Sequence, residues 1–146
     1  MVDRAKRDSA REILRNFIDC KITNDEFHTQ FPGSEHDLAL RAIRSNVWML
    51  YSDLHTHKLS GKHKPNAETK ALLERCVLFL DSGFEFEWPV PKISLTNILP
   101  NLRRRAREFM GMSPDSVPVR AASNGGDQTV WPFFRRTDYD ARLESD

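Results

Sequence analysis

The stretch Asn66-Ala-Glu-Thr-Lys-Ala-Leu-Leu-Glu-Arg-Cys-Val-Leu-Phe-Leu-Asp81 decides between a helical and a mixed fold. Its first half holds good helix formers behind an asparagine that can cap a helix N-terminus. The run Cys76–Leu80 is apolar on every side, as both a buried helix and a buried strand can be. A strand with a hairpin turn at 81–83 is the alternative. Because the helical period continues through the run, we predict a helix from Ala67 to about Asp81 whose inward side chains are Leu72, Leu73, Cys76, Val77 and Leu80.

Three patterns that precede this stretch also predict helices. Apolar residues recur at helical spacing between Asp3 and Cys20, with charges on the other side. A short helical turn is expected after Asn24, which we take as its N-cap. A further helix is expected to begin at Ser34 and to run to about His57, with one apolar face made of Leu40, Ile43, Val47, Leu50 and Leu54.

The residues after Asp81 predict a minor β element and one more helix. Phe84–Trp88 alternates strictly between apolar and charged residues, which is typical of a strand, and 128–134 is a candidate second strand. Both end in or contain a Trp-Pro pair, so we expect them to pair. Ile93–Met110 reads as helical, 112–126 as a long loop, and 138–143 as a terminal helical turn capped by Thr137. The predicted fold class is mainly α, a small helical domain with a minor two-stranded β element, with α+β as the alternative.

Length and charge narrow the classes of function. A chain of 146 residues suits a single globular domain with its own core. The net charge of +1 supplies no global field that would attract nucleic acid or a membrane surface. The two cysteines occur without a CxxC pattern and are expected to be core residues of a reducing compartment. No apolar segment indicates a signal peptide or a membrane span, so we expect a cytoplasmic protein without a membrane partner.

The segment from 53 to 57, Asp-Leu-His-Thr-His, resembles the opening motif of the polymerase and histidinol phosphatase metal-dependent hydrolases. The resemblance covers five residues and would imply a catalytic metal. In that family the motif follows a barrel strand, whereas here it ends a predicted helix, in which His55 and His57 diverge by about 200°. We therefore predict no metal and no cofactor. If the helix ended near Leu54, His55, His57 and His63 would be able to converge with Asp53.

Two groups of arginines are candidates for binding. Arg103, Arg104 and Arg107 belong to a basic helical run that suits nucleic acid as an alternative function. The favoured partner-binding segment is near the C-terminus, where a Trp, two Phe and two Arg occur within six residues. This is a composition enriched in protein interfaces, whereas packing of the aromatic residues into the core is the other interpretation. The predicted partner-binding residues are Trp131, Phe133, Phe134, Arg135 and Arg136.

No nucleophile motif or phosphate-binding loop is present, so no catalytic residue is predicted. Residues 73–89, together with Val130-Trp-Pro-Phe133, resemble small bacterial proteins of unassigned function, and that resemblance implies no activity. We expect a non-catalytic protein that binds another protein, by analogy with immunity proteins that neutralise a toxin. A nucleic-acid-binding accessory protein is the second hypothesis, and a metal-dependent hydrolase is the third.

Overall fold

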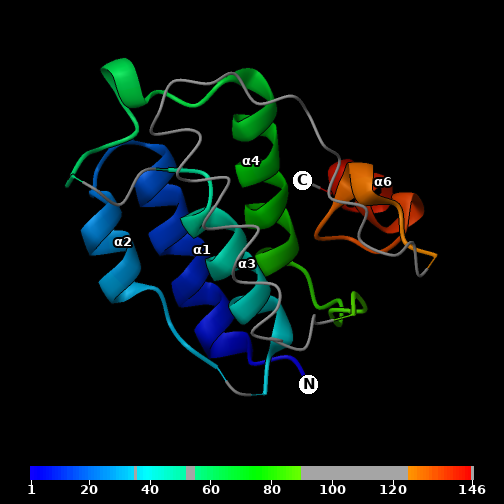
Figure 1. Ribbon diagram of the computed structural model, residues 1–146. Helices are drawn as coiled ribbons and strands as arrows, with labels where there is room; N and C mark the ends of the chain where they lie inside the picture. Colours follow the sequence, from blue (N-terminus) through cyan, green and yellow to red (C-terminus); the bar gives the residue numbers. More distant parts are fainter. Residues whose placement is uncertain (35, 52–54, 90–124, 146) are drawn as a thin grey trace, which may run out of the picture. The chain divides into compact units, whose positions relative to one another are not determined.

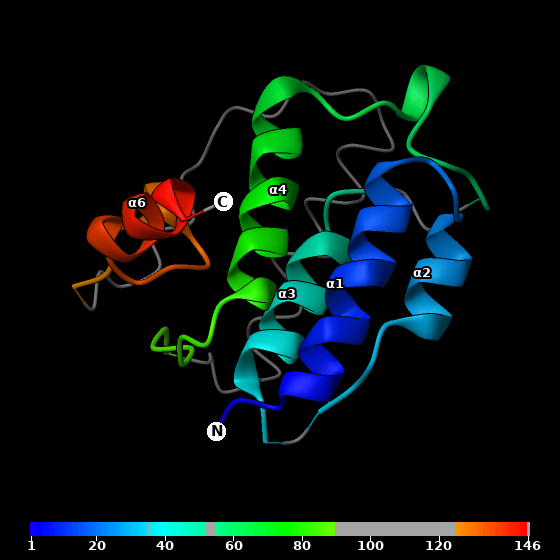
Figure 2. The same cartoon turned by 180° about the vertical axis from the view of Figure 1, so that it is seen from behind.

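The computed structural model describes residues 1–34, 36–51, 55–89 and 125–145. Four consecutive helices alternate in direction (Figures 1 and 2). They are α1 (Arg4–Ile18), α2 (Asn24–Gln30), α3 (Leu38–Trp48) and α4 (Ala67–Asp81). The first of them packs against both α2 and α4, and α3 packs against α4. The short 3-10 helices η1 (Gly61–His63) and η3 (Gln128–Val130) and the helix α6 (Arg136–Glu144) complete the described elements. The mainly helical class is confirmed.

The helix α4 forms where the sequence predicted it. The Asn66 side chain accepts a hydrogen bond of 2.7 Å from the backbone N–H of Thr69, which satisfies one of the free donors of the first turn. The helix is buried through its apolar run, with Cys76 and Leu80 fully inaccessible. The helix propensities of the residues, the Asn66 cap and the apolar period all favour a helix over this stretch.

The prediction that Asn24 caps α2 is wrong by one residue. Thr23 is the N-cap, and it forms a reciprocal capping box with Glu26. Asn24 is instead buried, and its side chain forms hydrogen bonds with the backbone of two residues that follow α3 in the sequence. Its amide oxygen accepts from the His57 N–H at 2.7 Å, and its amide nitrogen donates to the His55 carbonyl at 3.2 Å.

The helix α3 is shorter than predicted at both ends. It begins at Leu38 behind the N-cap Asp37 rather than at Ser34, and it ends at Trp48 rather than near His57. Tertiary contacts accompany both differences. Asp37 is held by an ion pair with α1, and the Asn24 side chain bonds to His57, whose backbone is not helical. Leu50, predicted to face the core, is 38% exposed as a result.

The core includes buried side chains from α1 to α4. The rings of Phe17 and Phe27 stack at 4.8 Å, and Tyr51 meets Phe17 edge-on at 5.4 Å. The C-terminal segment contributes Val130 and Phe133 to the same core cluster. Other members from the helices include Leu14, Leu40, Ile43, Val47, Leu73 and Leu80.

A fully buried ion pair joins the starts of α1 and α3. The Arg7 guanidinium donates to both carboxylate oxygens of Asp37, at 2.7 and 3.0 Å. It also donates at 2.8 Å to the carbonyl of Phe84, beyond the end of α4. Arg7 therefore links three segments that are distant in sequence.

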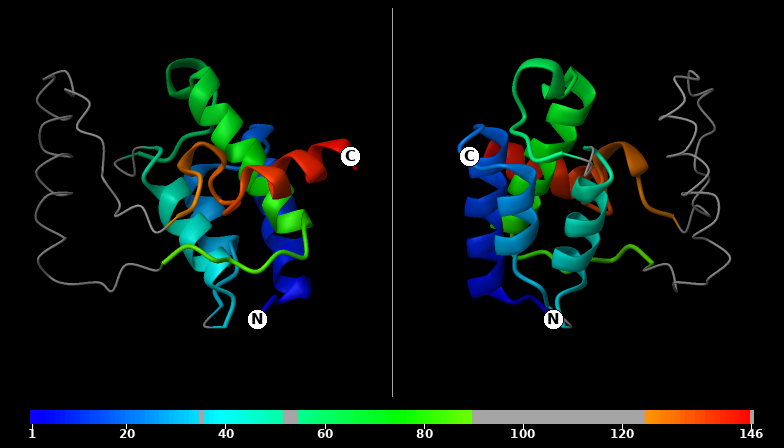
Figure 3. Two further views of the ribbon diagram at one scale, coloured as in Figure 1. Left: turned by 90° about the vertical axis from the view of Figure 1, so that its right-hand side faces the viewer. Right: turned by 60° about the vertical axis from the view of Figure 1, so that its left-hand side comes forward.

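The predicted β element is wrong within the described residues. Residues 83–88 leave α4 as an extended segment without a strand partner (Figure 3). The segment predicted to pair with them bonds mainly to itself: the Asp127 N–H donates to the Phe134 carbonyl at 3.0 Å, and 128–130 form a 3-10 turn. Pro132 lacks the N–H that a ladder requires. The two segments are joined by the Trp88 indole, which donates to the carbonyls of Pro132 and Phe133.

The predicted helix at 93–110 and nearly all of the predicted loop at 112–126 lie outside the described residues. The same holds for Arg103, Arg104 and Arg107. In the part of the chain that the structure describes, no helix has the length and apolar character needed to cross a bilayer.

Candidate functional site

The predicted partner-binding segment mostly closes the core. Phe133 is 1% exposed and packs edge-on against Phe79 of α4 at 5.1 Å. Trp131 is half-buried, and its carbonyl accepts a bond of 3.1 Å from Arg75. Phe134 lies against Trp88 at 5.3 Å. The aromatic residues of this segment therefore follow the core-packing interpretation.

The two arginines of the segment are exposed and paired. Arg135 makes a bidentate contact with Glu87, with both N–O distances at 2.8 Å. The Glu87 carboxylate, through its hydrogen bond and its charge, raises the pKa of Arg135. Arg136 lies 3.5 Å from the Asp140 carboxylate. Each guanidinium thus has a carboxylate partner within the chain.

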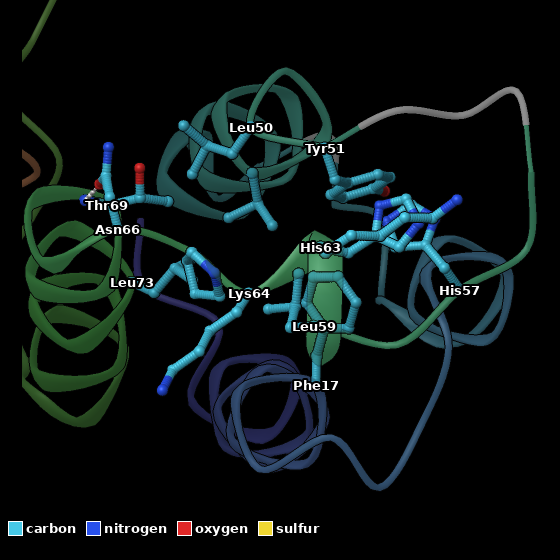
Figure 4. A pocket seen from close by; sticks show the side chains of 13 residues that line it. Phe17, Leu50, Tyr51, His57, Leu59, His63, Lys64, Asn66, Thr69 and Leu73 are labelled. Carbon is cyan, nitrogen blue, oxygen red and sulfur yellow. Dashed lines mark hydrogen bonds between the residues drawn. The ribbon is translucent and has the colours of Figure 1, made fainter.

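The histidine segment borders a cavity of about 370 Å³ (Figure 4). The cavity lies between the C-terminal ends of α1 and α3, the N-terminal end of α4 and the loop that carries η1. Figure 4 shows His57, His63 and Tyr51 at one edge and Asn66, Thr69 and Leu73 at the other. His57 and His63 lie together here, which is part of the convergence of Asp53, His55, His57 and His63 that the sequence had left open.

The rings of His57 and His63 stack at 3.9 Å with an interplanar angle of 22°. The Nδ1 atom of His57 lies 2.7 Å from the carbonyl of His55, and its Nε2 atom is buried without a hydrogen-bond partner among the described residues. Burial lowers the pKa of His63, and the nearby His57, Lys62 and His55 lower it further.

Metal binding requires at least a third ligand. Among the described residues, no group of three or more His, Cys, Asp or Glu side chains is placed to hold a metal ion. Asp53, the carboxylate of the hydrolase-like motif, lies outside the described residues. The prediction that no metal binds here stays a prediction.

Sequence reasoning missed a second hollow, which lies between α2 and α3. It has a volume of about 300 Å³ and a basic and aromatic lining. Arg41, Arg44 and Trp48 follow one another at i, i+3 and i+7 and form what we name the α3 surface. That spacing is present in the sequence. Because the helix was predicted to continue to about His57, Trp48 was not expected to be its last residue. The other lining residues are His28, Pro32, Gly33, Ser34, Leu40 and Ser45.

The cysteines offer no reactive thiol by the criteria of exposure and charge. Cys76 is completely buried, and burial raises its pKa far above the ordinary value, so the thiolate is strongly disfavoured. Cys20 is half-buried, and its thiol donates to the Leu59 carbonyl at 3.2 Å. Both cysteines are free, as expected for small core residues.

Comparisons with known proteins do not identify a family. No protein-family model matches the chain, and searches of curated proteins and of solved structures find no match. The resemblances seen in the sequence remain expectations.

Proposed function

We propose that the protein is a non-catalytic binding protein whose partner is another protein, and that the α3 surface carries the contact. The observation that carries this proposal is an exposed tryptophan beside two arginines at the rim of a groove. Trp48 is 37% exposed. Tryptophan and arginine are enriched in protein interfaces, where they often supply most of the binding energy.

The charge of the groove indicates an acidic partner segment. His28, Arg41 and Arg44 line it, and no described lining residue is acidic. Arg44 is positioned by a bond of 3.0 Å to the His28 carbonyl, and neither arginine forms an ion pair with a described carboxylate. A partner carboxylate would therefore meet guanidinium groups that are not already neutralised. This distinguishes the α3 surface from Arg135 and Arg136.

The segment 131–136 is the second candidate for the contact. Its exposed arginines support it, whereas the burial of Phe133 removes the aromatic residue best suited to anchor a partner. Nucleic acid as a partner would draw on Arg103, Arg104 and Arg107, and nothing in the described residues favours it over protein.

The test is affinity capture from the native cell, with nuclease treatment, followed by titration of the purified partner. Trp48→Ala removes the exposed ring, and Arg41→Glu reverses a charge that has no partner within the described residues. We expect each variant to weaken binding by about tenfold or more, as for a central interface residue. Arg136→Glu, an exposed arginine outside the groove, is the matched control and should bind like the parent.

Three results would contradict the proposal. Retention of the partner by both α3 variants would exclude the α3 surface. Loss of binding with Arg136→Glu alone would transfer the contact to the C-terminal segment. A complex that disappears on nuclease treatment would make nucleic acid the partner.

A further inference from the structure

The cavity beside the histidines combines an apolar floor with a cationic rim. Phe17, Val47, Leu59 and Leu73 supply buried apolar surface from α1, α3, the η1 loop and α4. The rim carries Lys62, Lys64 and the two stacked histidines, and no acidic residue occurs among the described residues that line the cavity. Apolar walls with a few convergent polar groups are typical of small-molecule sites.

The rim groups are not already neutralised within the described residues. Neither Lys62 nor Lys64 forms an ion pair with a described carboxylate, whereas other exposed cations of the chain do, such as Arg15 with Glu74 at 2.8 Å. The lowered pKa of His63 has the positive charge of its neighbours as one cause, after burial. An anion placed beside His63 and Lys62 would relieve the repulsion between them.

The polar atoms at the opposite edge can orient a ligand. Asn66 and Thr69 line that edge at the first turn of α4. The Asn66 oxygen is already bonded to the Thr69 N–H, so its amide nitrogen is the donor that points elsewhere. No described lining residue is an arginine, and no glycine-rich turn surrounds the cavity, so the forked donors typical of phosphate sites are missing from the described lining.

We propose that this cavity binds a small organic carboxylate, with its apolar chain against Phe17, Leu59 and Leu73 and its carboxylate at the part of the rim formed by Lys62 and the histidine pair. The volume of about 370 Å³ lies within the range of roughly 300–1,000 Å³ found for ligand pockets. It suits a chain of medium length rather than a large cofactor. The proposal is independent of the α3 surface and of any protein partner.

Octanoate is a suitable probe, because it pairs one carboxylate with a short apolar chain. We would titrate isotope-labelled protein with octanoate, with octan-1-ol and with acetate, and follow amide resonances by NMR. We expect octanoate to shift the resonances of Leu50, Leu59, His63 and Thr69. It should bind about tenfold or more tightly than octan-1-ol, because hydrogen bonds to charged groups exceed neutral ones, and than acetate, which lacks the apolar chain.

Matched variants test the charge of the rim. Lys62→Gln should weaken octanoate binding by about tenfold. Lys70→Gln, an exposed lysine of α4 outside the cavity, should not change it. The proposal is overturned if octan-1-ol binds as tightly as octanoate, if the shifts centre on residues outside the cavity, or if the rim variant binds like Lys70→Gln.

Discussion

At the scale of single residues, Arg7 and Asp37 form a buried pair in which the loss of either partner is costly. Both side chains are almost inaccessible to water, and each depends on the other for the compensation of its charge. Removing one partner of such a pair leaves an unpaired buried charge, which costs far more than the loss of an exposed pair. Replacement of both by apolar residues need not be destabilising.

We predict that Arg7→Met lowers the free energy of unfolding by about 3–5 kcal/mol. Arg15→Met is the matched control, because Arg15 forms an exposed ion pair with Glu74, and such pairs contribute about 0–1 kcal/mol. Urea denaturation measures both variants. Equal midpoints for the two would show that the buried pair adds nothing beyond a surface pair.

The lowered pKa of Asp37 predicts how the free energy of unfolding depends on pH. Burial raises the pKa of Asp37, but the hydrogen bond from Arg7, the N–H groups of Asp3 and Ala39 and the charge of Arg7 outweigh it and hold the pKa below its ordinary value. A group whose pKa is lower in the folded state stabilises fully above its unfolded pKa, about 3.9 for aspartate, and loses this contribution as the pH falls through the folded pKa.

We therefore expect the free energy of unfolding to fall below about pH 4 in the parent. Asp37→Asn should be less stable at neutral pH and show a flatter acid slope, since it lacks this titrating group. Urea melts at successive pH values down to acid give the slope. A variant slope as steep as that of the parent would assign the acid sensitivity to other carboxylates.

Two aromatic rings lie so close to Gly126 that they leave little room for a side chain at this position. A Cβ at this position would lie 2.7 Å from Cη2 of Trp88 and 2.8 Å from the Phe134 ring. We predict that Gly126→Ala costs about 1–3 kcal/mol, the usual range for overpacking. Gly83→Ala, where a Cβ meets no atom within 4 Å, should stay close to the parent. Thermal melts compare them, and similar melting temperatures for the two variants would mean that the rings move aside freely.

At the scale of elements, the early end of α3 redistributes its side chains. Ile43 remains in the core with no accessible surface, while Leu50 falls beyond the helix and is 38% exposed. Trp48, the last residue of α3, lines the hollow between α2 and α3. Leu50, two residues later, lines the cavity beside the histidines. The length of one helix thus determines both candidate binding surfaces.

We predict that Ile43→Ala costs about 2–5 kcal/mol. Leu50→Ala should cost clearly less, because part of its surface already meets water. Urea denaturation distinguishes the two. A large loss with Leu50→Ala would indicate that α3 continues further in solution and would return Leu50 to the apolar stripe expected from the sequence.

At the scale of the whole molecule, the two ends of the chain share one core. Phe133 packs on Phe79 of α4, and the Arg142 side chain pairs with Asp81 at the end of the same helix. A C-terminal segment held in this way should unfold together with the helices rather than before them.

We predict that Phe133→Ala lowers the free energy of unfolding by about 3–5 kcal/mol, the range for deleting a buried ring. In the parent, tryptophan fluorescence and far-ultraviolet circular dichroism should report one transition, because Trp88 senses the C-terminal segment and the dichroism senses the helices. Two separate transitions would show that the C-terminal segment unfolds independently of the helices.

The sequence by itself determined the elements whose signals are local. The helix from Ala67 to Asp81 follows from its cap, its propensities and its period, all of which act within a few residues. The mainly helical class follows from the same signals in α1, α2 and α3. The burial of Cys76 and Leu80 was also predictable, since an apolar run on every side of a helix needs cover.

Only the tertiary structure decided what depends on partners distant in sequence. Asn24 bonds to the His57 backbone across 33 residues, a contact that the apolar period of the sequence cannot predict. Glu87 pairs with Arg135 across 48 residues. This pairing weakens the prediction, made from composition, that the segment 131–136 binds a partner. Composition and period describe neighbours along the chain, whereas these contacts exist only after the helices have packed, and the bond from Asn24 positions His57 at its cavity.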